Sequence, residues 1–159
     1  MKKFSILLFA VTVISANAFA QNWTSYKDKS ANFSISVPTT PTITEDTQNG
    51  LRRVKAEYGD YSVYINVYDL PNGIKGDPFM AAANMIVSGN SQQAKLIRKS
   101  DLIINGQKGL RALFYEPERK FYVDKGVVVE GKNAYSITLI RSNQDDTAVA
   151  DKMFDSINK

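Results

Sequence analysis

The chain of 159 residues contains no histidine and no cysteine. The lack of histidine excludes Ser-His-Asp and Cys-His catalytic groups, and also zinc and haem sites that need an imidazole ligand. The lack of cysteine excludes disulfides and an acylated N-terminal cysteine, so the domain must be stabilised by its core alone. We expect no catalytic residue, no cofactor and no transition metal, because the remaining carboxylates select harder ions.

Glycine is sparse, with nine residues, and most of these stand singly at predicted turns. Neither G-x-G-x-x-G nor G-x-x-x-x-G-K-[ST] occurs, so no loop of this sequence is suited to cradling phosphates. Internal repeats, low-complexity tracts and linkers are also missing.

The longest apolar run lies at the start of the chain, from Phe4 to Ile14. Lys2 and Lys3 precede it and Ala18-Phe19-Ala20 follows, which is the order of a secretory signal peptide. The run is shorter than the ~20 residues of a membrane-spanning helix. We therefore predict that residues 1–20 are a signal peptide cleaved after Ala20, and that the mature protein is periplasmic or secreted without a membrane span.

Residues 21–159 have the length of a single domain. Lys2 and Lys3 supply two of the 20 basic residues, so the 16 acidic residues leave the mature chain a net charge of only +2. This small charge, together with export, argues against nucleic acid as a partner.

The centre of the fold is predicted to be a meander of three antiparallel strands, Lys108–Tyr115, Lys120–Val129 and Ala134–Arg141. Apolar and polar residues alternate in the second and third of these, which predicts one face in the core and one towards water. The residues between them, 130–133, are polar and include a glycine, as a tight hairpin requires.

Further strands are predicted on both sides of a helix. A lead-in strand, in which Trp23 covers an edge of the core, precedes four more strands: Phe33–Val37, Thr42–Thr47, Leu51–Tyr58 and Tyr61–Leu70. After the helix, Ala94–Ile104 forms a hairpin with the meander through Asn105-Gly106, with a bulge expected near Asp101.

Two helices complete the prediction. Asp77 and Pro78 open the first as N-cap and first residue, its apolar stripe is Phe79, Ala82, Ala83, Ile86 and Val87, and Gly89 ends it. The second spans Asp145–Asn158, with Asp145 and Asp146 in its first turn and Ala150, Met153, Phe154 and Ile157 facing the sheet.

Without histidine and cysteine, an enzyme would have to use carboxylates, lysine, serine or tyrosine, and two pairs of carboxylates are the candidates for acid–base or cation chemistry. Glu116 and Glu118 flank Pro117 in a predicted hairpin loop, where we expect solvated charges rather than a desolvated general acid. Asp145 and Asp146 lack the alternating oxygen ligands of a calcium loop and are better explained as helix-terminal acids.

Tyrosine is the one side chain that gathers in a pattern, at Tyr58, Tyr61, Tyr64, Tyr68, Tyr115, Tyr122 and Tyr135. Such rows usually stabilise strands through cross-strand contacts, but an open row also makes a binding surface. If Val63, Ile65 and Val67 face the core, the other face of that strand carries Tyr64, Asn66 and Tyr68, which are our candidate partner-binding residues. The basic residues Arg52, Arg53, Lys55 and Arg111 are expected near the same face.

Four segments resemble PsbP-like domains, the α/β/α sandwiches typified by the extrinsic subunit of photosystem II and the Mog protein. They are F-S-I-S-V-P, N-G-Q-K-G-L-R-A, A-Y-S-I-T-L and K-M-F-D-S-I. The resemblance covers Trp23 to Ile157 and implies an α+β fold, with a central antiparallel sheet of about six to eight strands flanked by two helices. It also implies a non-catalytic accessory module, and it transfers packing positions but no binding residue.

Two functions follow from these observations. The first is an interaction module of the cell envelope that binds an envelope protein. The alternative is a carrier of a small apolar ligand, held in an apolar pocket between helix and sheet. A pocket above ~300 Å³ with convergent polar groups would favour the carrier.

Overall fold

The computed structural model describes residues 22–46, 49–88, 92–145 and 147–158. The predicted signal peptide and its cleavage point lie outside these residues, as do Thr47, Gly89 and Asp146. The elements in chain order are β1 (Thr24–Lys27), β2 (Ser34–Val37), β3 (Thr42–Asp46), β4 (Leu51–Tyr58), β5 (Tyr61–Asp69), α1 (Pro78–Ser88), β6 (Lys95–Ile104), β7 (Gln107–Glu116), β8 (Phe121–Glu130), β9 (Asn133–Arg141) and α2 (Ala148–Asp155).

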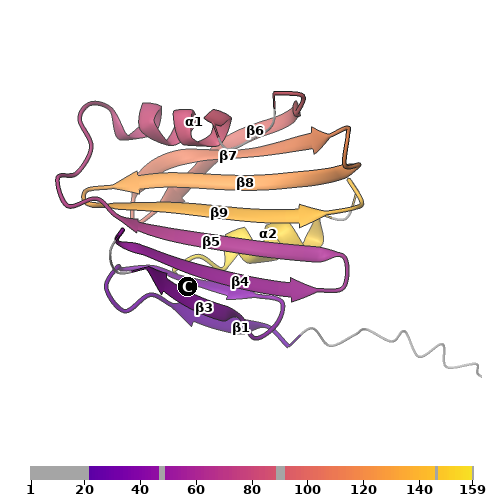
Figure 1. Cartoon of the computed structure of the whole chain (residues 1–159), viewed down its shortest axis with the longest axis horizontal. Coiled ribbons are helices and arrows are strands. Elements are labelled where there is room, and N and C mark those ends of the chain that lie inside the picture. The colour runs from indigo at the N-terminus through magenta and orange to yellow at the C-terminus, as the bar shows by residue number, and fades with distance from the viewer. Residues whose placement is uncertain (1–21, 47–48, 89–91, 146, 159) are drawn as a thin grey trace, which may run out of the picture.

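Seven strands form one antiparallel sheet in the order β3-β4-β5-β9-β8-β7-β6 (Figure 1). The predicted meander, β7 to β9, forms the middle of the sheet, and the pairing of β9 with β5 joins it to the strands from the first half of the chain. Strands β1 and β2 make a separate two-stranded sheet. The predicted α+β architecture, with its strand number and its two helices, is confirmed.

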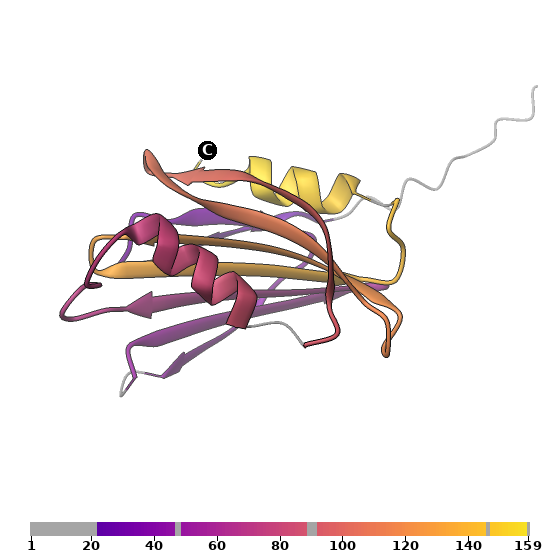
Figure 2. The same ribbon diagram turned by 90° about the horizontal axis from the view of Figure 1, so that it is seen from above.

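The two faces of the large sheet are covered differently, with α1 on one side and α2 on the other (Figure 2). Helix α1 packs with Ala82 and Ile86 on the apolar side chains of β7 and β8. Helix α2 and the β1–β2 hairpin cover the opposite face, where Val63, Ile65 and Val67 are fully buried. Trp23 packs against this second core, as predicted.

Strand β8 departs from the predicted alternation. All seven residues from Val123 to Val129 are buried, including Asp124 and Lys125. The reason is that β8 lies in the middle of the sheet between α1 and the α2 layer, so neither of its faces reaches water. In a strand that is buried on both faces, alternate side chains point into the two layers that cover the sheet, and neither set points towards water.

Turn chemistry explains the local chain reversals. Asn105 and Gly106 adopt positive φ values of 52° and 78°, as a two-residue hairpin turn of the primed type needs. Gly131 (φ 56°) provides the same conformation between β8 and β9, in the predicted polar turn.

Three local predictions were wrong. The irregularity in β6 lies between Leu96 and Arg98 and not at Asp101. Val87 is 72% exposed because it points away from the sheet, so the stripe of α1 is narrower than predicted. Helix α2 begins only at Ala148, and its first-turn acid is Asp151 instead of Asp145.

The predicted start of α1 is confirmed, since the Phe79 amide donates to the Asp77 carboxylate at 2.8 Å. Of the helices in the described ranges, neither has the length and apolar character that crossing a membrane requires.

Candidate functional site

The candidate residues Tyr64, Asn66 and Tyr68 lie in a row on the α1 side of β5. Register places Tyr64 between Lys55 and Thr138, and Asn66 between Arg53 and Ser136. Because Val63, Ile65 and Val67 are buried on the other face, this row is fixed by the strand period.

Helix α1 covers only part of this face. It packs over β7 and β8, and nothing is drawn in front of β4 and β5 in Figure 1. Tyr64, Asn66 and Tyr68 are all partly buried, but of the two tyrosines only Tyr68 packs against the α1 core. The candidate row is therefore divided between a tyrosine that supports α1 and a partly exposed tyrosine that does not.

We call the accessible region the open sheet face and define it by Arg53, Lys55, Tyr64, Asn66 and Thr138. The Lys55 Nζ lies 6.0 Å from the centre of the Tyr64 ring and also pairs with Glu57 at 2.8 Å. The Arg53 Nε donates to the Asn66 side-chain oxygen at 3.2 Å. The face thus presents a partly buried aromatic ring on β5 beside two exposed cations of β4.

The expectation that four basic residues share one face was wrong. Arg52 and Arg111 point to the α2 side, where each is bound by two carboxylates. Adjacent residues of a strand point to opposite faces, so Arg52 and Arg53 cannot act together.

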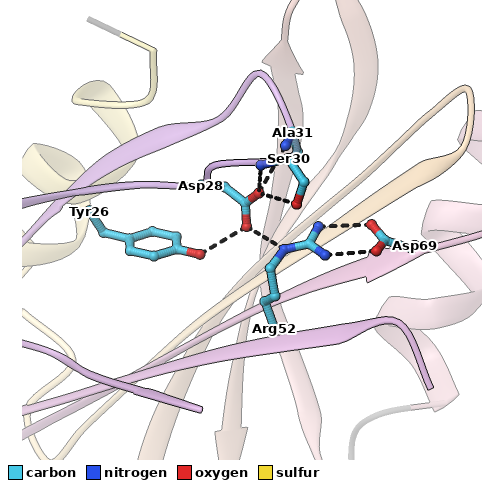
Figure 3. A network of polar contacts seen from close by, with 6 residues as sticks. All are labelled: Tyr26, Asp28, Ser30, Ala31, Arg52 and Asp69. Carbon is cyan, nitrogen blue, oxygen red and sulfur yellow. Dashed lines mark hydrogen bonds and ion pairs between the residues drawn. The ribbon is translucent and has the colours of Figure 1, made fainter. Parts of the chain in front are cut away.

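Arg52 is the centre of a network that holds the β1–β2 hairpin against the sheet (Figure 3). Its Nε donates to Asp28 at 2.6 Å, and its two terminal nitrogens donate to both oxygens of Asp69 at 2.7 and 2.8 Å. Asp28 also accepts hydrogen bonds from the Tyr26 hydroxyl and from the amides of Ser30 and Ala31. Charge-assisted hydrogen bonds of this kind are strong, so this network of Tyr26, Asp28, Arg52 and Asp69, which we call the clamp, fixes the hairpin to the sheet.

Asp28 is buried in this clamp and stays ionised. Burial by itself raises the pKa of the carboxyl, but the hydrogen bonds from Arg52, Ser30, Tyr26 and Ala31 outweigh it and hold the pKa below its usual value. The pKa of Asp69 is lowered too, chiefly by its bond to Arg52.

A second ionic network joins α2 to the sheet. Arg111 donates to both oxygens of Asp124 at 2.8 Å and to Asp151 of α2 at 2.8 Å. Arg141, with only 1% of its surface exposed, lies with its Nη1 3.6 Å from Asp124. The acid Asp124 in the middle of the apolar strand β8 was a sequence signal for this network, but its partners are too distant in the chain to be identified from the sequence.

Three further tyrosines, on β7, β8 and β9, are structural. Tyr135 is fully buried and stacks on Phe33 with ring centres 4.8 Å apart. Burial and the nearby Glu130 raise the pKa of Tyr135 to about 12, so its hydroxyl stays protonated and donates to Glu130 at 3.2 Å. Tyr115 and Tyr122 form a tilted pair across β7 and β8, 4.9 Å apart.

The carboxylate candidates are not brought together into a site. Glu116 is buried with 8% exposure, which corrects the expectation of a solvated pair, whereas Glu118 is exposed. Asp145 is exposed ahead of α2. Over the described ranges, no three acidic side chains lie close enough together to hold a metal ion.

Two hollows flank strand β6. The first, of about 370 Å³, lies between α1 and the sheet and is lined by Phe79, Ala83, Lys99, Ser100, Asp101 and Leu110. The second, of about 390 Å³, lies on the α2 side and is lined by Ile97, Arg98, Leu113, Gln144, Asp145 and Thr147. Both open to solvent, so neither encloses a ligand.

The chain matches no protein-family model and no curated protein. Among solved structures it is similar to cyanobacterial PsbP (CyanoP) from Synechocystis sp. PCC 6803, with a TM-score of 0.55 and 12% identity over 86% of this chain and 92% of that one. A protein from Bacteroides thetaiotaomicron is more distant, with a TM-score of 0.44 and 12% identity over 84% of this chain and 47% of that one. A Pseudomonas aeruginosa protein of unknown function gives a TM-score of 0.42 and 14% identity over 77% of this chain and 85% of that one. The chain therefore has a PsbP-like fold.

Proposed function

Starting from this PsbP-like fold, we propose that the protein is an exported, non-catalytic interaction module that binds a protein of the cell envelope through its open sheet face. The observation that carries the proposal is the incomplete cover of the sheet by α1, which leaves the partly buried Tyr64 beside the exposed Arg53 and Lys55. Tyrosine and arginine are the residues that most often dominate binding at protein interfaces. A rigid strand also holds them in place before the partner arrives.

The small-ligand alternative has weaker support. The hollow between α1 and the sheet has the volume that small ligands need, and it has polar groups at Lys99 and Asp101. It is open along β6, however, while carriers enclose most of the ligand surface. An extended partner fits such an opening better than a small molecule does.

The test is affinity capture by the mature protein from envelope extract, followed by quantitative mass spectrometry. Tyr64→Ala should lose at least one protein that the wild type captures, with a melting temperature lowered by no more than a few degrees, because this ring does not pack against the α1 core. Tyr58→Ala is the matched control, since this half-buried tyrosine of β4 lies on the opposite face and should keep the captured protein. Capture of the same proteins by all three forms would reject the open sheet face as the binding site.

A stability measurement separates the two candidate tyrosines. Tyr68→Ala should lower the free energy of unfolding by about 2–4 kcal/mol, because the ring packs against the α1 core. Tyr64→Ala should lower it by less than about 1 kcal/mol. Equal losses in urea unfolding would contradict this difference: two small losses would show that α1 covers neither ring, and two large losses that it covers both.

A further inference from the structure

The two edges of the large sheet are built differently. At one edge, β3 has only five residues. At the other, β6 has ten residues and pairs only with β7 among the described strands. A long edge strand offers a row of unpaired amides and carbonyls to any extended chain, and proteins usually blunt such edges.

Strand β6 has little protection against pairing with a further strand. Its residues from Lys95 to Asp101 are all exposed, and three large apolar side chains reach water: Leu96 at 55%, Ile97 at 41% and Ile103 at 64% exposure. The irregularity at Leu96–Arg98 interrupts the strand near its start, which leaves a regular edge from Arg98 to Ile104.

The hairpin register identifies the groups that this edge offers. In a two-residue hairpin the residues beside the turn exchange both hydrogen bonds, and hydrogen-bonded and open pairs then alternate. Ile104 pairs with Gln107 beside the turn, so Leu102, Ser100 and Arg98 use their backbone groups on β7. The amides and carbonyls of Lys99, Asp101 and Ile103 consequently face outward.

The hollows lie where the side chains of an added strand would go. Successive side chains of such a strand point alternately to the two faces of the sheet. Beside β6 there is one hollow on each face, of about 370 Å³ on the α1 side and about 390 Å³ on the α2 side. Backbone pairing with pockets for alternate side chains is the general mode of strand addition.

Charge selects the occupant. Lys95, Arg98 and Lys99 are exposed along the edge, and the one acid of the strand, Asp101, is paired with the Lys108 ammonium at 2.8 Å. A second copy of β6 would carry the same excess of positive charge, which opposes pairing between two molecules of this chain. We propose that the free edge of β6 binds an extended, acidic and apolar segment of another protein as an additional strand.

The test uses a synthetic peptide of about eight residues that alternates valine and glutamate. Binding to the mature protein is measured by fluorescence anisotropy at low salt. The peptide should bind at least about tenfold more tightly than its valine–lysine counterpart. Exchanging Arg98 and Lys99 for glutamate should reverse this preference.

Asp101→Pro and Asp101→Ala form the matched pair of variants. Both lose the carboxylate, but only proline removes the outward amide, and the ladder to β7 does not use that amide. Asp101→Pro should weaken peptide binding about tenfold or more while Asp101→Ala should not. Tyr64→Ala should leave peptide binding unchanged, so this result does not depend on the open sheet face.

Hydrogen exchange gives a second readout on the wild type, in case the proline variant unfolds. The bound peptide should slow exchange at the amides of Lys99, Asp101 and Ile103. Binding that leaves these amides unprotected, or no binding by either peptide, would overturn the proposal. So would a dimer in sedimentation that Asp101→Pro dissociates, because the occupant would then be a second copy.

Discussion

Asp28 links the β1–β2 hairpin to the sheet through one carboxylate, and this link predicts a pH dependence. Its pKa is held below the ordinary value in the folded protein, so the folded state binds fewer protons than the unfolded one. The resulting stabilisation is complete above the unfolded pKa of about 3.9 and is lost as the pH falls towards the lower folded-state value.

Asp28→Asn should therefore lose less stability than the wild type when the pH falls below about 4. At neutral pH the variant should be less stable by about 1–3 kcal/mol, because the ionic bond to Arg52 is gone. Urea unfolding of both proteins between neutral and acid pH measures the two slopes. Parallel slopes would show that Asp28 does not contribute to acid unfolding.

Gly126 shows how closely α2 approaches the sheet. A Cβ atom at this position would lie 2.5 Å from Cε1 of Phe154 and 2.7 Å from Cδ2 of Leu102. The backbone of Gly126 has no positive φ, so the glycine is needed because a side chain here would clash with Phe154 and Leu102. The aromatic ring of α2 thus packs directly on the backbone of β8.

At the scale of elements, α2 depends on Phe154. The ring is 6% exposed and has the Arg111 guanidinium 4.2 Å from its centre. Phe154→Ala should lower the free energy of unfolding by about 3–5 kcal/mol, because the cavity above Gly126 cannot be filled by its neighbours. Urea unfolding measures this loss.

The control for this variant is Asp155→Ala, an exposed position of the same helix that should cost less than about 0.5 kcal/mol. Lys152 is a poorer control, because its ammonium lies 4.3 Å from the Trp23 ring and joins α2 to the hairpin. Comparable losses at Phe154 and Asp155 would show that α2 contributes little to stability.

The elements were predictable where their signals are local. Asn105-Gly106 and Asp77-Pro78 fix a turn and a helix start through their own backbone preferences. The pairing of Arg52 with Asp28 was not predictable, because it depends on how a separate hairpin packs on the sheet. Nor did periodicity show that α1 would cover Tyr68 and leave Tyr64 open, since both residues follow the same alternation.

At the scale of the whole molecule, the layers divide the surface into regions of different use. The α2 side is covered by a helix, a hairpin and two ionic networks, except for the hollow beside β6. The α1 side is closed over β7 and β8 only, which leaves the open sheet face at β4–β5 and the free edge at β6. The two regions lie on different strands towards opposite ends of the sheet, so the two proposed partners would not compete for one surface.

The proposed envelope partner requires the domain to reach the envelope, which makes export the prediction for the whole chain. Lys2 and Lys3, the apolar run and Ala18-Phe19-Ala20 occur in the order that signal peptidase recognises. The exported protein should begin at Gln21, and its intact mass should match residues 21–159. Replacing Ala18 and Ala20 with bulky residues should block cleavage and leave the precursor at the membrane, because the enzyme needs small side chains at both positions. A wild-type protein that keeps Met1 to Ala20 in the membrane fraction would contradict this prediction and place the domain on an anchor.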